Sequence, residues 1–140
     1  MLVFNKYLKE LGYKEDNFPF GKKDNRYKLS KKYGVVEAQT WDLHTTIILE
    51  LYTYLRFFQE ECPKGIPAPY IDETKPDHGL KDWRKTLQKM IDGLKAYIEA
   101  ENLSPSDIGD TDYFNLKNDL MSRFDEGWKL IGENMEALWW

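Results

Sequence analysis

The feature that most constrains this chain is the helical spacing of its large apolar residues. Between residues 80 and 101, apolar side chains recur at intervals of three and four positions, which places them on one face of an α-helix. The residues that share this face are Trp83, Leu87, Met90, Ile91, Leu94, Tyr97 and Ile98. Charged and amide side chains occupy other positions around the helix, so the pattern predicts a long amphipathic helix over about residues 80–101.

Two further stretches show the same kind of spacing. The first runs from about Glu37 to Glu61, and Pro63 ends it. Its apolar residues are Leu43, Ile47, Leu51, Tyr54, Leu55 and Phe58, widened by Ile48, Tyr52 and Phe57. A helix that is apolar over most of its circumference is usually central, so we expect this helix to be central.

The third stretch begins near residues 110–112 and continues almost to the end of the chain. Its heptad-like positions are Tyr113, Leu116, Leu120, Phe124, Gly127, Trp128, Ile131, Met135 and Leu138. Roughly 28 helical residues span about 42 Å, which is longer than a compact domain of this size needs. We therefore expect this helix to extend into a partner.

These patterns predict an all-α fold in which three long amphipathic helices pack as a bundle, after a short helix over residues 3–11. A length of 140 residues suits a single domain, 1–140. Residues 13–33 form an irregular or hairpin-like segment with six bases between Lys22 and Lys32, which is either solvated or contacts an acidic partner or phosphates. Residues 62–79 form a proline-rich connection that is either functional or wraps along the bundle.

The chain carries few of the parts that catalysis needs. Its histidines, His44 and His78, lie far apart and outside any carboxylate–histidine motif, so we expect no metal and no cofactor. No Gly-x-Ser-x-Gly elbow and no glycine-rich phosphate loop occurs. Glu133 and Glu136 share a helix face, but a second acidic motif is missing. We therefore predict a protein that is not an enzyme, with a carboxylate-based nucleotide hydrolase as an alternative.

Composition limits the compartment and the partners. The single cysteine, Cys62, cannot form an internal disulfide, which favours a reducing compartment. No stretch approaches the roughly 18 to 20 apolar residues that span a bilayer, and the first residues do not resemble a secretion leader. A net charge of −4 does not favour a general nucleic-acid binder. We expect a cytosolic protein with no membrane partner.

Arginine is scarce, and three of the four arginines stand beside aromatic residues within the predicted helices. Arginine offers a planar fork of donors for phosphate or carboxylate and stacks on rings. A ligand site for a small anionic, nucleotide-like molecule would combine Arg56, Arg84, Arg123, Trp41, Tyr54 and His44. The alternative is three separate surface ion pairs, for example Arg56 with Glu60.

Two other features bear on partners. Glu50 lies inside an apolar run of the first long helix, where it is either exposed at the edge or paired with Arg84 or Arg123. The chain ends on two tryptophans, and tryptophan is enriched at interfaces. These residues either fold back onto the domain or bury in another subunit. The predicted interface of a homo-oligomer comprises Trp128, Leu138, Trp139 and Trp140.

From Gly34 onward the chain resembles a widespread group of small, largely uncharacterised helical proteins encoded by tailed bacteriophages. The segments that carry the resemblance are 34–36, 40–43, 82–83, 87–91, 126–128 and 138–139, which include Thr40-Trp41-Asp42-Leu43 and Glu126-Gly127-Trp128. An acid commonly follows the Trp-x-Leu unit in that group, where this chain has His44.

The resemblance implies an accessory protein made in the cytoplasm of an infected bacterial host. Such proteins commonly act by stoichiometric binding, so the expected function is to counter host defence by sequestering a small anionic nucleotide-type signal. The alternative of a different class is a protein–protein inhibitor of a host defence or metabolic protein. A minor structural component of the virion is a further possibility.

Overall fold

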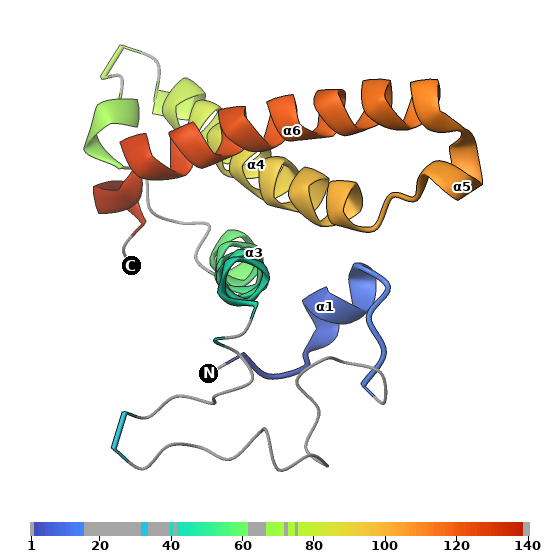
Figure 1. Cartoon of the computed structure of the whole chain (residues 1–140). Helices are drawn as coiled ribbons and strands as arrows, with labels where there is room; N and C mark the ends of the chain where they lie inside the picture. Colours follow the sequence, from blue (N-terminus) through green and yellow to red (C-terminus); the bar gives the residue numbers. More distant parts are fainter. Residues whose placement is uncertain are drawn as a thin grey trace. The chain divides into compact units, whose positions relative to one another are not determined.

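A computed structural model describes residues 2–15, 32–33, 40, 42–61, 67–71, 73–74 and 76–138 (Figure 1). Every regular element within these residues is a helix, and none is a strand. Three of the helices are long: α3 (Leu43–Glu61), α4 (Pro76–Glu101) and α6 (Asp110–Glu133). The all-α prediction with three long helices is therefore confirmed. Most of the basic segment 13–33 and the expected start of the first long helix lie outside the described residues.

The chain divides into two compact units, Met1–Tyr54 and Leu55–Trp140. The boundary falls inside α3, so both units contain part of that helix. The expectation of a single domain stays a prediction.

The first unit contains the short helix α1 (Lys6–Glu10) and the first three turns of α3. Asn5 caps α1, because its side-chain oxygen accepts hydrogen bonds from the backbone amides of Tyr7 and Leu8 at 3.0 and 3.3 Å. The amide nitrogen of the same side chain donates to the Thr53 hydroxyl on α3 at 3.3 Å. One asparagine thus both starts α1 and joins it to α3.

The second unit is built on a hairpin of α4 and α6, joined through the single-turn helix α5 (Pro105–Ile108). Gly109 connects α5 to α6 with a φ of 83°, a left-handed conformation that glycine adopts without strain. The predicted apolar face of α4 is buried, with Trp83, Leu87, Met90, Ile91, Leu94 and Ile98 all at or below 4% exposure. α4 begins at Pro76, earlier than expected, because proline is tolerated in the first helical turn.

The two helices run antiparallel and touch through their backbones. A methyl group built on Gly93 would lie 2.7 Å from the Cα of Gly127, and one built on Gly127 would lie 2.8 Å from the Cα of Gly93. Toward the α5 end, Ala96 and Ala100 of α4 pack with Leu120 of α6. Small residues on both helices therefore permit a close crossing that larger side chains would prevent.

The proline-rich connection contacts both helices of the hairpin through Tyr70, in the short 3-10 helix η3 (Ala68–Tyr70). The Tyr70 ring packs on Trp83 with centroids 5.1 Å apart. The Tyr70 hydroxyl lies 3.1 Å from the Thr86 hydroxyl on α4 and donates to the Asn134 side-chain oxygen, 3.0 Å away, just after α6. A second short 3-10 helix, η4 (Met135–Ala137), follows.

The last turns of α3 also pack on α4 within the second unit. Phe58 meets Trp83 edge to face with centroids 6.5 Å apart, and the Gln59 amide donates to Gln88 at 2.8 Å. The second unit therefore holds parts of all three long helices in contact.

Two glycines of α6 provide a matched pair for testing the close crossing. We expect Gly127→Ala to lower the free energy of unfolding by about 1–3 kcal/mol, because the added methyl group meets the α4 backbone. Gly132→Ala should instead raise it by up to about 1 kcal/mol, because nothing lies within 4 Å and alanine is the better helix former. Urea denaturation followed by circular dichroism at low protein concentration measures both. Equal effects of the two substitutions would contradict this account of the crossing.

Removing the Tyr70 hydroxyl tests the second contact. We expect Tyr70→Phe to lower the free energy of unfolding by about 1–2 kcal/mol, because Thr86 and Asn134 lose a shared partner. Tyr54→Phe is the control, since the Tyr54 side chain is 60% exposed, and its effect should stay within about 0.5 kcal/mol. A Tyr70 variant as stable as the control would show that the bridge contributes nothing.

Candidate functional site

Two of the three arginines predicted to bind a ligand form ion pairs within their own helices. Arg56 lies 3.2 Å from Glu60 on α3, and Arg123 lies 2.6 Å from Asp119 on α6. Both pairs have the i, i+4 spacing of ordinary helix-surface pairs. These contacts match the alternative of separate surface ion pairs for Arg56 and Arg123.

The hairpin geometry separates Arg84 from Arg123. Arg84 precedes Gly93 by nine residues on α4, and Arg123 precedes Gly127 by four residues on α6. Because the helices run antiparallel and cross at the two glycines, these offsets point in opposite directions along the hairpin. The two arginines are therefore about 13 residues apart along its axis, which is roughly 20 Å. The structure does not bring these two side chains together.

The remaining residues of the predicted ligand site belong to the first unit. The Nδ1 atom of His44 lies 3.0 Å from the carboxylate of Asp42, and both side chains are exposed. Tyr54 is exposed and donates a long hydrogen bond of 3.4 Å to Glu50. Trp41 lies outside the described residues. An anionic-ligand site that combines these residues with the arginines stays a prediction.

What α3 does present is a row of exposed apolar side chains along one side. Leu43, Ile47, Tyr54 and Phe57 follow one another at intervals of four, seven and three residues, and each is between 44% and 60% exposed. We call these four residues the α3 stripe. The other side of the helix is buried, through Ile48, Leu49, Tyr52 and Leu55. Burial is therefore confined to one side of α3, and its expected central position stays a prediction.

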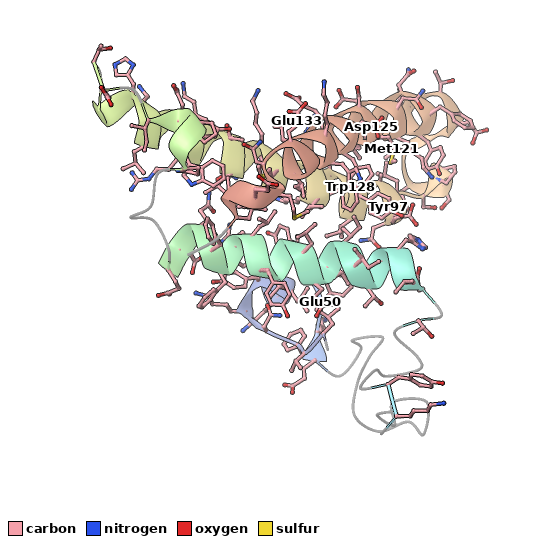
Figure 2. All side chains as sticks on the ribbon, turned by 90° about the vertical axis from the view of Figure 1, so that its left-hand side faces the viewer. Glu50, Tyr97, Met121, Asp125, Trp128 and Glu133 are labelled. Atoms are coloured by element: carbon pink, nitrogen blue, oxygen red, sulfur yellow. The ribbon has the colours of Figure 1, made fainter. Side chains whose placement is uncertain are left out.

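Glu50 lies in the middle of the α3 stripe. It shares the helix face of Ile47 and Tyr54, three residues after the first and four before the second. Figure 2 labels its side chain on α3. This side chain is half-buried and accepts the hydrogen bond from the Tyr54 hydroxyl. The stripe thus carries one negative charge between two pairs of apolar groups, over 14 residues or about 21 Å of helix.

The predicted interface tryptophan, Trp128, is 44% exposed on α6. Its ring lies 5.7 Å from that of Phe124, which in turn lies 4.8 Å from the Tyr97 ring on α4. Figure 2 labels Tyr97 and Trp128 on the hairpin, with Met121 and Asp125 on the same helix as Trp128. Leu138 is half-buried, and Trp139 and Trp140 lie outside the described residues. Whether these residues form an interface stays a prediction.

The pKa values of Lys117 and Tyr13 are raised, each for a different physical reason. A hydrogen bond to the Tyr113 hydroxyl, at 3.1 Å, raises the pKa of Lys117 on α6. Burial, followed by the nearby Asp42 carboxylate, raises the pKa of Tyr13. Both shifts favour the charge state that lysine and tyrosine already have near neutral pH.

Acidic side chains on the described helices are dispersed. Glu133, one of the two carboxylates considered for catalysis, lies 3.8 Å from Lys129. Within the described residues, no three His, Cys, Asp or Glu side chains come together in a group able to hold a metal ion. The part of the chain that the structure describes also contains no helix that is both long and apolar enough to cross a membrane.

The α3 stripe is a surface that the sequence pattern alone does not reveal. Because α3 is apolar around most of its circumference, the spacing of its apolar residues does not separate the exposed Leu43, Ile47 and Tyr54 from their buried neighbours.

Comparison of the chain with protein-family models, with curated proteins and with solved structures finds no match.

Proposed function

We propose that this protein acts by stoichiometric binding, and that it presents the α3 stripe to an apolar groove on another protein. The observation that carries the proposal is the row of four large side chains, between 44% and 60% exposed, on a single helix. Anchors at such intervals on one helix face are the way in which amphipathic helices occupy hydrophobic grooves. Large apolar side chains that are exposed together on one surface, beside a polar group, are typical of interaction sites.

The energetics favour this mode of binding. Burying the exposed half of each stripe residue contributes on the order of 1 kcal/mol per side chain. Because α3 is already helical and one of its sides is already packed, binding does not have to order the helix. A preformed helix keeps more of the contact energy as affinity than a segment that folds on binding.

The charge of Glu50 favours a partner other than a second copy of this chain. Two copies paired through the centre of the α3 stripe would bring two Glu50 carboxylates together, and close like charges are unfavourable. A groove with a basic side chain or backbone amides opposite Glu50 would complement the stripe. The chemistry of the surface therefore favours a protein with an apolar groove and a positive rim.

The biological setting of the proposal comes from the resemblance to phage accessory proteins. In that setting the partner is a protein of the bacterial host, and occupying its groove counters host defence. Sequestration of an anionic nucleotide-type signal is the alternative, and the 20 Å separation of Arg84 from Arg123 gives it less support than the α3 stripe gives to protein binding.

The proposal is tested by placing a photo-crosslinking amino acid at Tyr54 in bacteria that express the chain. We expect one host protein to be captured at Tyr54 and not at Lys85, an exposed control position on α4. Purified partner and chain should then bind at a one-to-one ratio. Phe57→Glu should weaken that binding at least about tenfold, whereas Lys85→Glu should leave it unchanged. Binding that is insensitive to Phe57→Glu would remove α3 as the binding surface.

Calorimetric titration with cyclic and ADP-ribose-type nucleotides tests the alternative on the same protein. The protein-binding proposal expects no heat of binding from any of them. Tight nucleotide binding that is lost in both Arg84→Ala and Arg123→Ala would replace the proposal by a ligand trap. Circular dichroism of each variant confirms that the helices are retained.

A further inference from the structure

The α3 stripe belongs to a longer row of residues with a regular spacing. Two acids, Glu50 and Glu61, lie on the same side of the helix as the stripe. We call the complete row the α3 seam, and it consists of Leu43, Ile47, Glu50, Tyr54, Phe57 and Glu61. Its intervals are four, three, four, three and four residues, from the first residue of α3 to the last. Five of the six side chains are exposed, and that of Glu50 is half-buried.

This alternation of three and four residues is the core spacing of a coiled coil. It amounts to about 3.5 residues per turn, whereas a straight helix has about 3.6, so the seam drifts by about 20° in every heptad. A second helix that crosses α3 at about 20° in a left-handed sense follows this drift. The seam extends over the whole of α3, or about 27 Å, so a second helix of similar length can cover it.

The seam is separate from the side of α3 that packs within the chain. Ile48, Leu49, Tyr52 and Leu55 are buried, and none of them belongs to the seam. The hydrogen bond from Asn5 reaches Thr53, which also lies outside the seam. A second helix can therefore lie along the seam without displacing these contacts.

The two acids limit which helix can occupy the seam. A charge at a core position of a coiled coil costs stability unless the facing residue complements it, and it thereby selects the partner and the register. Glu50 and Glu61 are 11 residues apart. In parallel and in antiparallel pairing alike, the core positions that face them have the same separation on the second helix. A complementary helix therefore has Lys or Arg at two core positions with that separation.

A second copy of α3 does not meet this requirement, because the seam contains no basic residue. Parallel pairing of two copies sets Glu50 against Glu50 and Glu61 against Glu61, and close like charges are unfavourable. Antiparallel pairing over the full length of α3 sets Glu61 of each copy against Leu43 of the other. An apolar side chain does not compensate the charge of a carboxylate. The charges thus favour a helix of a different sequence.

We propose that the partner contributes one helix, which pairs with the α3 seam as a left-handed coiled coil. The core positions of this helix are apolar, except for two bases that pair with Glu50 and Glu61. This inference rests on the function proposed above and identifies the groove that receives the α3 stripe. It is the groove between side-chain ridges of a single helix of the partner.

A synthetic peptide tests the chemistry of the seam before the partner is known. The peptide has about four heptads with leucine at the core positions, except for two lysines separated like Glu50 and Glu61. It is labelled with a fluorophore and used at nanomolar concentration, and fluorescence anisotropy should show that it binds the full chain. The double variant Glu50→Gln with Glu61→Gln should weaken this binding at least about tenfold. Asp125→Asn, the same kind of change at an exposed acid of α6, should leave it unchanged.

A charge exchange makes the test specific. In a matched peptide, two glutamates replace the two lysines. The chain should bind the lysine peptide more tightly, whereas the double variant Glu50→Lys with Glu61→Lys should prefer the glutamate peptide. Circular dichroism of each variant checks that the helices are retained.

Photo-crosslinking then locates the helix on the host protein. The crosslinking amino acid is placed in turn at Ile47, Tyr54 and Glu61, which follow one another at seven-residue intervals. We expect the three captured sites to lie in one segment of the host protein and to be about seven residues apart.

The coiled-coil pairing and the proposed function fail in different ways. Equal binding of the two peptides, or captured sites scattered over several segments of the host protein, would overturn the pairing and leave α3 as the binding surface. Self-association of the chain that is abolished by Phe57→Glu would make a second copy the occupant and would also overturn it. The expected charge preference without any host protein captured at Tyr54 would support the seam and remove the proposed function.

Discussion

The backbone contact between Gly93 and Gly127 determines how α4 and α6 lie, and much of the second unit depends on it. Because neither residue has a side chain, the two helices approach until their Cα atoms limit the distance. That approach brings Ala96 and Ala100 against Leu120, and the Tyr97 ring against Phe124. It also places residue 134 close enough to α4 for the Tyr70 hydroxyl to reach Asn134 and Thr86 at once.

The same contact decides which side chains can act together. The antiparallel arrangement determines which residues of α4 and α6 lie side by side. It places Arg84 and Arg123 at different positions along the hairpin axis. It also uses one side of α6 for the hairpin, which leaves Phe114 and Trp128 accessible on another.

How much the sequence could predict differs between helices for a physical reason. α4 has one apolar side, so the spacing of Trp83, Leu87 and Leu94 identified both the helix and its buried face. α3 is apolar nearly all round, and spacing alone cannot say which side of such a helix stays exposed. The sequence pattern places the arginines on helices, but the distance between Arg84 and Arg123 depends on where α4 and α6 cross. That crossing depends on Gly93, a residue that no motif identified.

The short link between α4 and α6 has a consequence for folding. The pairs that hold the hairpin, such as Gly93 with Gly127 and Ala100 with Leu120, are separated by only about 20 to 34 residues of chain. Contacts between near neighbours in sequence form fast, because little chain entropy is lost when the loop closes. On a ribosome α6 emerges soon after α4, so it finds a nearby partner already made, and the hairpin has a kinetic route to its structure that does not wait for distant segments.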